Sequence, residues 1–592
     1  MRTLLITPPL LQPNAPYAAG PLLAAWMKER GHDVRQADLS LALLRRLFSR
    51  EGTRLLLERV GFPEAEAAPW VERVEEAIDF LCGRNPAAAS EFSRRGSLPE
   101  GEGLRRAHAR NERLKWNFRG LPDFDRARHL TALWLDDLAA VARREDAAFG
   151  FSRYGESLAA ALPSFAPLRE WLEGPKSLFV EWLESLTDRE MAAFRPELVA
   201  LTVPFPGCLP GALTVARRIR ETAPGVRIAL GGGYVNTELR ELAEPALFDY
   251  VDAVCLDSGF LPLARLAEGG PPVRTFVREA GAVRLLDDPS ARDPAHGDLP
   301  APVYDGLRLE DYFGLFETLN PVVALWSERP WNRLMAAQGC HWARCAFCDV
   351  SLDYVRRHDP AAPGVVCDWM ESTMRRTGFS GFHFVDESLP PALIDGLCDE
   401  ILRRGLRVEW WGNVRFLSRF AETALPERMA AAGCLAVTGG LETVCDRTLG
   451  LMRKGVSVAG AERALRAFAS AGILTHAYLM YGFPTQTLSE TMAALETVRR
   501  LFDEGSLHSA YWHRFALTAH SEAMRRPDRF GIRPLPDGFA GFARNEVPFA
   551  ASFDHDLDVV GRMLRGATYN YSLGIGLDER PARRFAERFA GS

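Results

Sequence analysis

Three cysteines within nine residues are the part of this sequence best suited to chemistry. They occur as Cys340-x4-Cys345-x2-Cys348, directly after an apolar run. A short turn can direct three thiolates towards one point, and iron–sulfur clusters are held by such local sets of thiolates. Three cysteines leave one iron of a four-iron cluster without a protein thiolate. The count therefore predicts a catalytic [4Fe-4S] centre whose open iron takes a bidentate ligand.

Two alternatives to a cluster stay open for these cysteines: a zinc site, and thiols with a structural role only. Zinc normally has a fourth Cys or His at ligand spacing, whereas here His341 lies inside the first gap and no second Cys-x2-Cys pair follows. The other seven cysteines stand singly, mostly in apolar runs, as is typical of buried thiols. They are Cys82, Cys208, Cys255, Cys367, Cys398, Cys434 and Cys445. Such usage without a recognisable signal peptide predicts a reducing cytoplasm and no disulfide framework.

The cysteine motif resembles the signature of the radical SAM enzymes. Their usual spacing has three residues in the first gap, and this chain has four; the aromatic Phe347 before the last cysteine also fits the family. The resemblance implies that S-adenosylmethionine (SAM) chelates the open iron and that Phe347 lies against the adenine.

Composition places the chain among globular proteins of several domains. Its 592 residues are 47% hydrophobic and 25% charged, and no apolar run reaches the ~18–20 residues that a membrane span requires. The first residues lack the features of a secretory signal. A net charge of −6 with interspersed Arg and Glu predicts no nucleic-acid partner.

The first part of the chain, residues 1–270, predicts a Rossmann-like α/β unit interrupted by helices. Its expected strands are 3–7, 33–37, 197–203, 226–230 and 250–255. Apolar strands that alternate with helices predict a parallel sheet covered on both faces. From about residue 40 to 190, helical periods recur without strand signals, which we interpret as a helical insertion that serves as a lid or a docking surface.

Several features of this unit together resemble the cobalamin-binding domain of the cobalamin-dependent radical SAM family: the Thr-Pro-Pro that ends the first strand, the glycine run 231–233, and residues 250–254 followed by Ser-Gly. The resemblance implies cobalamin contacts at the strand ends, where ligands of such sheets bind. The candidate contacts are Thr202, Gly231, Gly232, Gly233, Ser258 and Gly259. A glycine run is also compatible with a tight turn alone. No Asp-x-His-x-x-Gly motif is present and the usual Gly-Glu-Gly-Glu is replaced at 256–260, so base-off cobalamin without a histidine from that motif is expected.

The second part predicts a partial (β/α)6 radical SAM barrel at 326–520, after a linker with a hairpin at 271–325 and before a C-terminal cap at 521–592. The expected strands are 332–338, 381–385, 407–411, 435–439, 474–480 and 509–515. Barrel chemistry gathers at the carboxyl ends of the strands. The cap would cover the barrel mouth and carry substrate specificity.

Polar residues follow these strands. The resemblance implies that Asp386 or Glu387 binds the methionine ammonium of SAM, that Arg415 binds its carboxylate or the ribose, and that Glu442 binds a sugar hydroxyl or the amine. Tyr481, at the end of the fifth strand, is the candidate catalytic residue. Each position has a structural alternative, since Asp386 could cap a helix and Glu442 could face a helix N-terminus.

These features predict a cobalamin-dependent radical SAM enzyme that forms a 5′-deoxyadenosyl radical and methylates an unactivated carbon. Two rivals stay open: a cyclase or rearrangement enzyme without methyl transfer, and a non-enzymatic metal- or cobalamin-binding scaffold, in which Asp386, Arg415 and Glu442 would not converge on the cysteines. The expected partners are an electron donor such as flavodoxin or ferredoxin and a small-molecule, lipid or peptide substrate.

Overall fold

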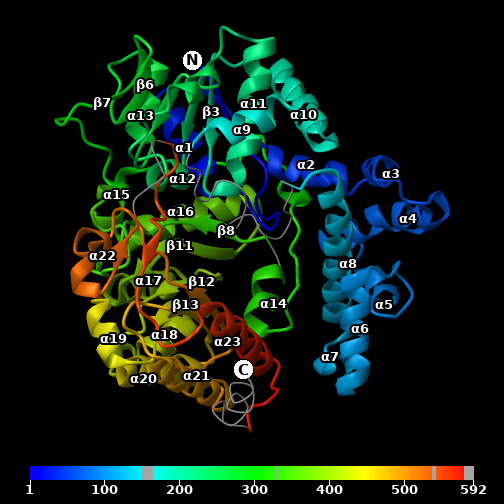
Figure 1. Cartoon of the computed structure of the whole chain (residues 1–592), viewed down its shortest axis with the longest axis vertical. Helices are drawn as coiled ribbons and strands as arrows, with labels where there is room; N and C mark the ends of the chain where they lie inside the picture. Colours follow the sequence, from blue (N-terminus) through cyan, green and yellow to red (C-terminus); the bar gives the residue numbers. More distant parts are fainter. Residues whose placement is uncertain (148–163, 329, 536–541, 579–592) are drawn as a thin grey trace.

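The computed structural model describes residues 1–147, 164–328, 330–535 and 542–578. Figure 1 shows two α/β units, one above the other, with helices from the first part of the chain standing beside them. Both units contain a parallel sheet. The predicted fold class, a Rossmann-like unit followed by a partial barrel, is confirmed.

The first unit is built on a seven-stranded sheet in the order β2-β1-β3-β4-β5-β6-β7. Its strands are β1 (Arg2–Thr7), β2 (Asp33–Asp38), β3 (Leu198–Thr202), β4 (Arg227–Gly231), β5 (Ala253–Cys255), β6 (Thr275–Glu279) and β7 (Ala282–Leu286). Strands β1 to β5 are parallel. This is a doubly wound order whose topological switch point lies between β1 and β3, and ligands of such sheets bind at the carboxyl ends beside that point.

Helices cover both faces of this sheet because its strands are apolar on both sides. One face packs against α1 (Ala19–Glu29) and α13 (Phe260–Glu268), and the other against α10 (Leu178–Phe194) and α11 (Leu209–Thr222). The short α12 (Gly233–Thr237) follows β4. The turns η2 (Pro206–Cys208) and η3 (Pro245–Asp249) complete the unit.

The hairpin expected around residues 280–281 is present, but it belongs to the sheet. Strand β6 pairs antiparallel with β5 and with β7, so the hairpin extends the first sheet and does not stand in a separate linker. Ala280 and Gly281 both have positive φ values, +49° and +80°, as the tight hairpin turn that matches strand twist requires.

The predicted helical insertion lies between β2 and β3. Its helices are α2 (Leu39–Leu47), α3 (Arg50–Arg59), α4 (Glu64–Leu81), α5 (Ala89–Phe92), α6 (Glu102–Leu114), α7 (Asn117–Gly120), α8 (Asp123–Glu145) and α9 (Ala166–Glu173), with the turn η1 (Pro86–Ala88). Trp134 of α8 is fully buried and stacks on Trp70 of α4 at 5.2 Å between ring centroids. The apolar core of the insertion is continuous with that of the first unit. Residues 148–163 of the predicted insertion lie outside the described residues.

The second unit contains six parallel strands in the order β15-β14-β13-β12-β11-β8. They are β8 (Asn332–Leu334), β11 (Gly381–Leu389), β12 (Glu409–Val414), β13 (Cys434–Glu442), β14 (Leu474–Tyr481) and β15 (Ser509–Arg514). The expected first strand is split, because β9 (Ala337–Gln338) leaves the sheet and pairs with β10 (Asp359–Pro360).

Helices follow the barrel strands, as expected for a βα repeat. They are α15 (Asp353–Arg356), α16 (Pro363–Thr377), α17 (Pro391–Arg404), α18 (Leu425–Ala431), α19 (Asp446–Leu451), α20 (Val458–Ser470) and α21 (Leu488–Asp503), with η6 (Ser418–Ala421). Helix α21 starts with a capping box in which Thr487 and Glu490 satisfy each other's backbone N–H groups. The connection from the first unit contains η4 (His296–Asp298), η5 (Leu309–Asp311) and α14 (Pro321–Glu328).

The C-terminal part packs on the last barrel strands. Helix α23 (Leu557–Ser572) contacts β15 and α21, and the Trp512 indole donates to the Thr568 hydroxyl at 2.8 Å. The shorter elements are α22 (Glu522–Arg525), η7 (Pro527–Phe530), β16 (Arg533–Pro534) and β17 (Phe549–Ala550). Residues 536–541 and 579–592 of the expected cap lie outside the described residues. None of the described helices is long and apolar enough to cross a membrane.

Candidate functional site

The three cysteines lie in the loop that follows β9, near the carboxyl end of the first barrel strand. Gly339 opens the loop with a φ of +74°, and a Cβ at this position would lie 2.0 Å from the Arg357 carbonyl oxygen. Only glycine therefore allows this close approach. Cys345 is buried, and Cys340 and Cys348 are half-buried.

Charged groups surround these thiols. The pKa of Cys345 is lowered to about 7 by a hydrogen bond with Cys348 and by the nearby Lys454 and Arg415, against the opposing effects of burial and of the Glu442 carboxylate. A lowered pKa favours the thiolate, which is the form that ligates metals. Arg415 and Glu442 thus lie near Cys345. That they form one site with Asp386 and the three cysteines stays a prediction.

A single-ion site is not formed by this arrangement. In the part of the chain that the structure describes, no three His, Cys, Asp or Glu side chains are grouped so that they could hold one metal ion. Structural zinc needs four ligands at about 2.0–2.3 Å from one point, whereas a four-iron cluster spreads its thiolates over several irons. His341 has its Nδ1 atom 3.1 Å from the Ser388 carbonyl oxygen. A [4Fe-4S] cluster at the cysteine loop stays a prediction.

Glu442, at the end of β13, forms a buried ion pair with Lys454. The Lys454 ammonium donates to Glu442 Oε1 at 2.6 Å, and both residues are 8% exposed. Burial alone would lower the pKa of Lys454, but Glu442 and the thiols of Cys345 and Cys348 raise it above its usual value. Glu442 also has a φ of +57°, which is uncommon for a residue with a Cβ. Such local strain clusters at functional sites.

Lys454 is a site residue that neither the cysteine motif nor the predicted strand ends indicate. It lies in the loop after α19, where no periodicity or spacing marks it. The chain has only four lysines among its 71 basic residues. Rarity does not single out Lys454, because Lys28 and Lys176 form ordinary, partly exposed ion pairs.

The adjacent carboxylates at the end of β11 differ in environment. Asp386 is 1% exposed, and its two oxygens accept from the N–H groups of Ala336 (3.0 Å) and Ala337 (2.6 Å). It therefore fixes the backbone that enters the cluster loop, and its contact with the methionine ammonium stays a prediction. The Glu387 side chain is exposed, and desolvation by the surrounding protein raises the pKa of its carboxyl. Its carboxylate makes no hydrogen bond to any described residue, so we favour Glu387 of the two.

Asp386→Asn is expected to lower the free energy of unfolding by ~1–3 kcal/mol, because the amide leaves one backbone N–H without an acceptor. Burial raises the pKa of Asp386 to about 7. The folded state thus favours the protonated carboxyl, whose contribution to stability is full below about pH 4 and is lost as the pH rises through about 7. In urea unfolding, the advantage of the wild type over the variant should be smaller at pH 8 than at pH 5. The exposed Asp528→Asn is the control; a gap that widens towards pH 8 would contradict this assignment.

Two predicted residues of the barrel rim lie in packed surroundings. The Tyr481 hydroxyl accepts from Arg565 of α23 at 3.0 Å, and a Cβ at Gly561 would lie 2.2 Å from it. Tyr481 thus packs under α23, and a catalytic role for it stays a prediction. Phe347 is half-buried, with the Lys454 ammonium 5.8 Å from its ring centroid. Its contact with adenine stays a prediction.

The glycine run after β4 packs against the chain itself. Gly232 has a φ of +113°, and a Cβ there would lie 2.5 Å from the Val203 carbonyl oxygen. A Cβ at Gly233 would lie 2.9 Å from the Pro204 carbonyl oxygen. These glycines therefore serve a close backbone approach next to Thr202, and their contact with cobalamin stays a prediction.

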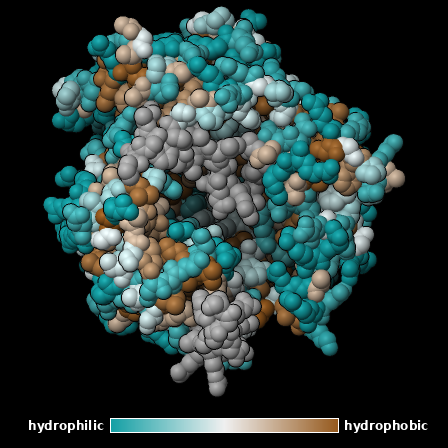
Figure 2. All heavy atoms as spheres, in the orientation of Figure 1, coloured by the Kyte–Doolittle hydropathy of each residue, from teal (hydrophilic) through white to brown (hydrophobic). Residues whose placement is uncertain are grey.

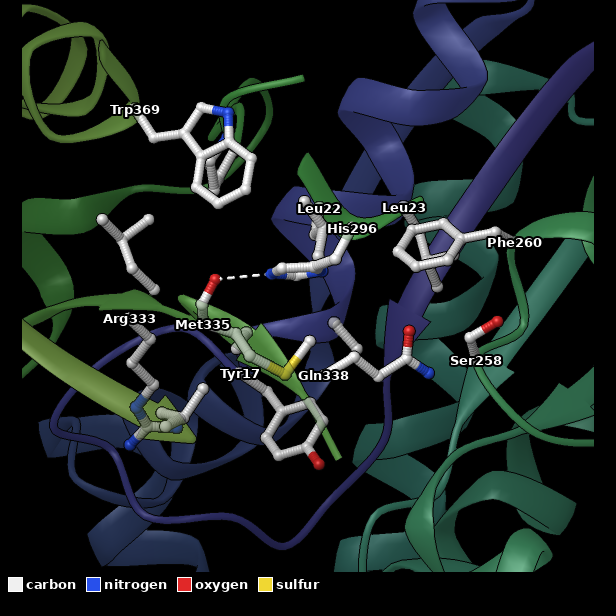
Figure 3. A pocket seen from close by; sticks show the side chains of 15 residues that line it. Tyr17, Leu22, Leu23, Ser258, Phe260, His296, Arg333, Met335, Gln338 and Trp369 are labelled. Atoms are coloured by element: carbon white, nitrogen blue, oxygen red, sulfur yellow. Dashed lines mark hydrogen bonds between the residues drawn. The ribbon is translucent and has the colours of Figure 1, made fainter. Parts of the chain in front are cut away.

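A cavity of about 280 Å³ lies where the carboxyl ends of the two sheets meet. It is lined by residues that follow β1 and β5, such as Tyr17 and Ser258, and by barrel residues such as Met335 and Gln338. In Figure 3, their side chains surround one space, and His296 bonds to the Met335 carbonyl at 2.7 Å. Gly259 adjoins it, and a Cβ there would meet no atom within 4 Å. Of the candidate cobalamin contacts, Ser258 thus lines this cavity and Gly259 adjoins it.

A second cavity, of about 420 Å³, lies on the inner face of the barrel under α14. Aromatic rings form its wall: His383 stacks on Trp411 at 3.5 Å between centroids, and Trp326 stacks on Trp411 at 5.3 Å. Tyr478 adds a hydroxyl-bearing ring, and Arg333 lines both cavities. Figure 2 shows the surface hollowed where the two units and the helical insertion meet.

Comparison with known proteins identifies relatives of low identity. No protein-family model matches the chain. It is 24% identical over 334 residues to an uncharacterized methyltransferase of Pyrococcus horikoshii, covering 54% of this chain and 68% of that protein. It is 22% identical over 337 residues to the anaerobic magnesium-protoporphyrin IX monomethyl ester cyclase of Rubrivivax gelatinosus, covering 56% of this chain and 58% of the cyclase.

Two solved structures are similar over much of the chain. The radical SAM methyltransferase TsrM from Kitasatospora setae, with tryptophan substrate and a SAM analogue bound, has a TM-score of 0.56 and 14% identity over 96% of this chain and 89% of TsrM. The cobalamin-dependent radical SAM enzyme OxsB, with aqua-cobalamin bound, has a TM-score of 0.50 and 15% identity. The match covers 66% of this chain and 60% of OxsB, so it spans less than two thirds of that protein. The chain thus shares the fold of cobalamin-dependent radical SAM enzymes.

Proposed function

We propose that this chain, which shares the fold of the cobalamin-dependent radical SAM enzymes, is itself such an enzyme and methylates an unactivated carbon of a small molecule or peptide. The observation that carries the proposal is that the carboxyl ends of the two sheets meet at one cavity. Residues after β1 and β5 of the first sheet and after β8 of the barrel line one cavity, and the cysteine loop follows directly on that barrel segment. Two cofactors bound at facing strand ends would lie close enough to act on one substrate.

The cysteine loop offers the residues that would hold a [4Fe-4S] cluster. Cys340, Cys345 and Cys348 supply thiolates, and the adjacent Arg415 and Lys454 offset the negative charge of a thiolate-ligated centre. When bound, the cluster and SAM supply a 5′-deoxyadenosyl radical and methylcobalamin supplies the methyl group. The protein itself contributes orientation and the exclusion of water.

The residues proposed for SAM offer one group of each sign. Glu387, which is exposed and makes no hydrogen bond to any described residue, suits the methionine ammonium. Arg415, stacked 4.2 Å over the Trp342 ring, and the Lys454–Glu442 pair suit the methionine carboxylate and the ribose hydroxyls. Phe347 supplies an apolar surface for adenine.

The aromatic cavity of the barrel is the proposed substrate chamber. Its wall of His383, Trp411 and Trp326 favours a planar ring, and Arg333 and Tyr478 offer hydrogen bonds. A flexible acyl chain cannot stack on these rings, whereas a planar ring can. A small ring-bearing substrate therefore suits the chamber better than a lipid.

The cobalamin proposal is tested at Ser258. The cavity beside it is mostly apolar, with Leu22, Leu23 and Phe260 in its lining, and would take the displaced base of cobalamin. Anaerobically reconstituted wild type should retain cobalamin with a base-off spectrum after gel filtration. Ser258→Trp should lose most of it because the indole fills the cavity, while Ser290→Trp, on an exposed turn, should behave like the wild type. Equal retention by Ser258→Trp, or no retention by the wild type, would remove cobalamin from this unit.

The activity is tested with SAM, methylcobalamin and a reductant under anaerobic conditions. Mass spectrometry should detect 5′-deoxyadenosine and a methylated product when panels of ring-bearing metabolites are supplied. A second candidate is ring formation without methyl transfer, which the similarity to a cyclase favours. Methyl-labelled SAM distinguishes the two, because only methyl transfer carries the label into the product.

A further inference from the structure

The gap between Cys340 and Cys345 contains four residues, and this length has a structural consequence. The loop turns at Ala343, which has a φ of +44°. The Trp342 indole packs directly against the backbone at Gly455. A Cβ at Gly455 would lie 2.1 Å from the indole, so glycine is required for this contact. The indole N–H donates to the Arg453 carbonyl at 2.9 Å, and Arg415 lies 4.2 Å over the ring. Trp342 is therefore held between the cluster loop and the loop after α19.

An open, basic pocket of about 690 Å³ adjoins this tryptophan. We call it the arginine pocket, after Arg344, Arg419 and Arg453, which line it around Trp342. All three arginines are exposed. Arg453 pairs with Glu522, whereas Arg344 and Arg419 form no ion pair with any residue of the described ranges. The exposed Asp446 also lines the pocket, so the positive charge that remains comes from Arg344 and Arg419. The chain as a whole has a net charge of −6.

The arginine pocket is also next to the thiols. Trp342 and Arg344 lie between Cys340 and Cys345 in the sequence, so the cluster loop itself is one wall of the pocket. On the same tryptophan, the buried Arg415 lies 4.2 Å over the ring and donates to the Lys454 carbonyl oxygen. An electron that enters at Trp342 therefore has only the width of one loop to cross.

We propose that the arginine pocket is the docking surface for an acidic, low-potential electron-transfer protein of the flavodoxin or ferredoxin type. The proposal rests on the proposed function, which consumes one electron per SAM. The donor loses one electron, and one-electron reduction of the SAM sulfonium breaks its C5′–S bond to give methionine and the 5′-deoxyadenosyl radical. Complementary charge steers such transient partners and raises their association rate. Because the chain is acidic overall, an acidic donor is repelled by most of its surface and attracted here.

The first test measures binding of purified, oxidised flavodoxin. Arg344→Glu/Arg419→Glu should raise the dissociation constant at least about tenfold at low salt, and the difference should disappear at high salt because exposed charges are screened. The matched control, Arg106→Glu/Arg375→Glu, changes the net charge equally at side chains that are 71% and 70% exposed on other helices. The control should bind flavodoxin as the wild type does. Unchanged affinity of the pocket variant, or equal loss in the control, would overturn the proposal.

The second test follows reduction of the reconstituted protein by stopped-flow absorbance. Reduction by flavodoxin hydroquinone should slow at least about tenfold in the pocket variant. Reduction by the small cation of reduced methyl viologen, which needs no basic pocket, should be unchanged. If the variant loses its cluster, the binding measurement still decides. If viologen-reduced wild type fails to cleave SAM, the proposed function fails while the docking result stands separately.

Discussion

Replacing Cys340, Cys345 and Cys348 together by alanine is expected to abolish the iron and acid-labile sulfide of anaerobically reconstituted protein, with complete loss of broad visible absorbance. The three residues are the thiolate set of one loop, and an iron–sulfur cluster is bound through such thiolates. The loop backbone should persist, because Gly339 and the β9–β10 pairing hold it independently of the side chains. SAM cleavage should disappear with the cluster.

The control for this triple variant is Cys82→Ala/Cys445→Ala, which removes two other half-buried thiols. It should keep iron, sulfide and absorbance at the wild-type level. Circular dichroism should show the same helix content for both variants and the wild type. A folded triple variant that retains iron and sulfide would show that this loop does not hold the cluster.

The second large effect is expected at the Lys454–Glu442 ion pair. Lys454→Met should lower the free energy of unfolding by ~3–5 kcal/mol, because it leaves a buried carboxylate without its counter-ion. Glu442→Gln should cost less, since the thiols of Cys345 and Cys348 still face the ammonium. The double variant Lys454→Met/Glu442→Gln should cost clearly less than the sum of the single variants, as urea unfolding would measure. Additive costs would contradict a coupled buried pair.

The same variants test the SAM site, and an exposed pair provides the control. Each single variant should weaken SAM binding by ~1.5–3 kcal/mol if its charged group hydrogen-bonds SAM. Arg466 and Glu504 form an ion pair at 3.0 Å with side chains 42% and 34% exposed, and removing it should cost at most ~1 kcal/mol. Isothermal titration of reconstituted protein with SAM measures the affinity. Unchanged SAM affinity in both single variants would leave the pair with a purely structural role.

Much of the fold could be predicted because its signals are local. Apolar strands alternating with helices indicated both parallel sheets, and the six barrel strands were each found near their observed positions. The cysteine loop was predictable for the same reason, since its three thiols lie within nine residues. Local spacing also indicated the hairpin at Ala280 and Gly281.

The direction of side chains could not be predicted, because it depends on long-range contacts. Tyr481 and Tyr478 are both near the end of β14, but an odd offset along a strand places side chains on opposite faces. Tyr478 therefore lines the inner cavity, and Tyr481 points to α23. Asp386 is bound to N–H groups about 50 residues away, and no pattern around position 386 contains that information.

By itself, the sequence determined the order of the elements, the cysteine loop and the strand ends at which chemistry gathers, because these follow from spacing and periodicity along one segment. Only the tertiary structure decided which charges meet. Lys454 reaches Glu442 through a loop after α19, Gly232 packs against Val203 of a neighbouring strand end, and Trp342 rests on Gly455. Each of these contacts joins separate segments, and its distance is set by the packing of whole helices and strands that no local pattern specifies.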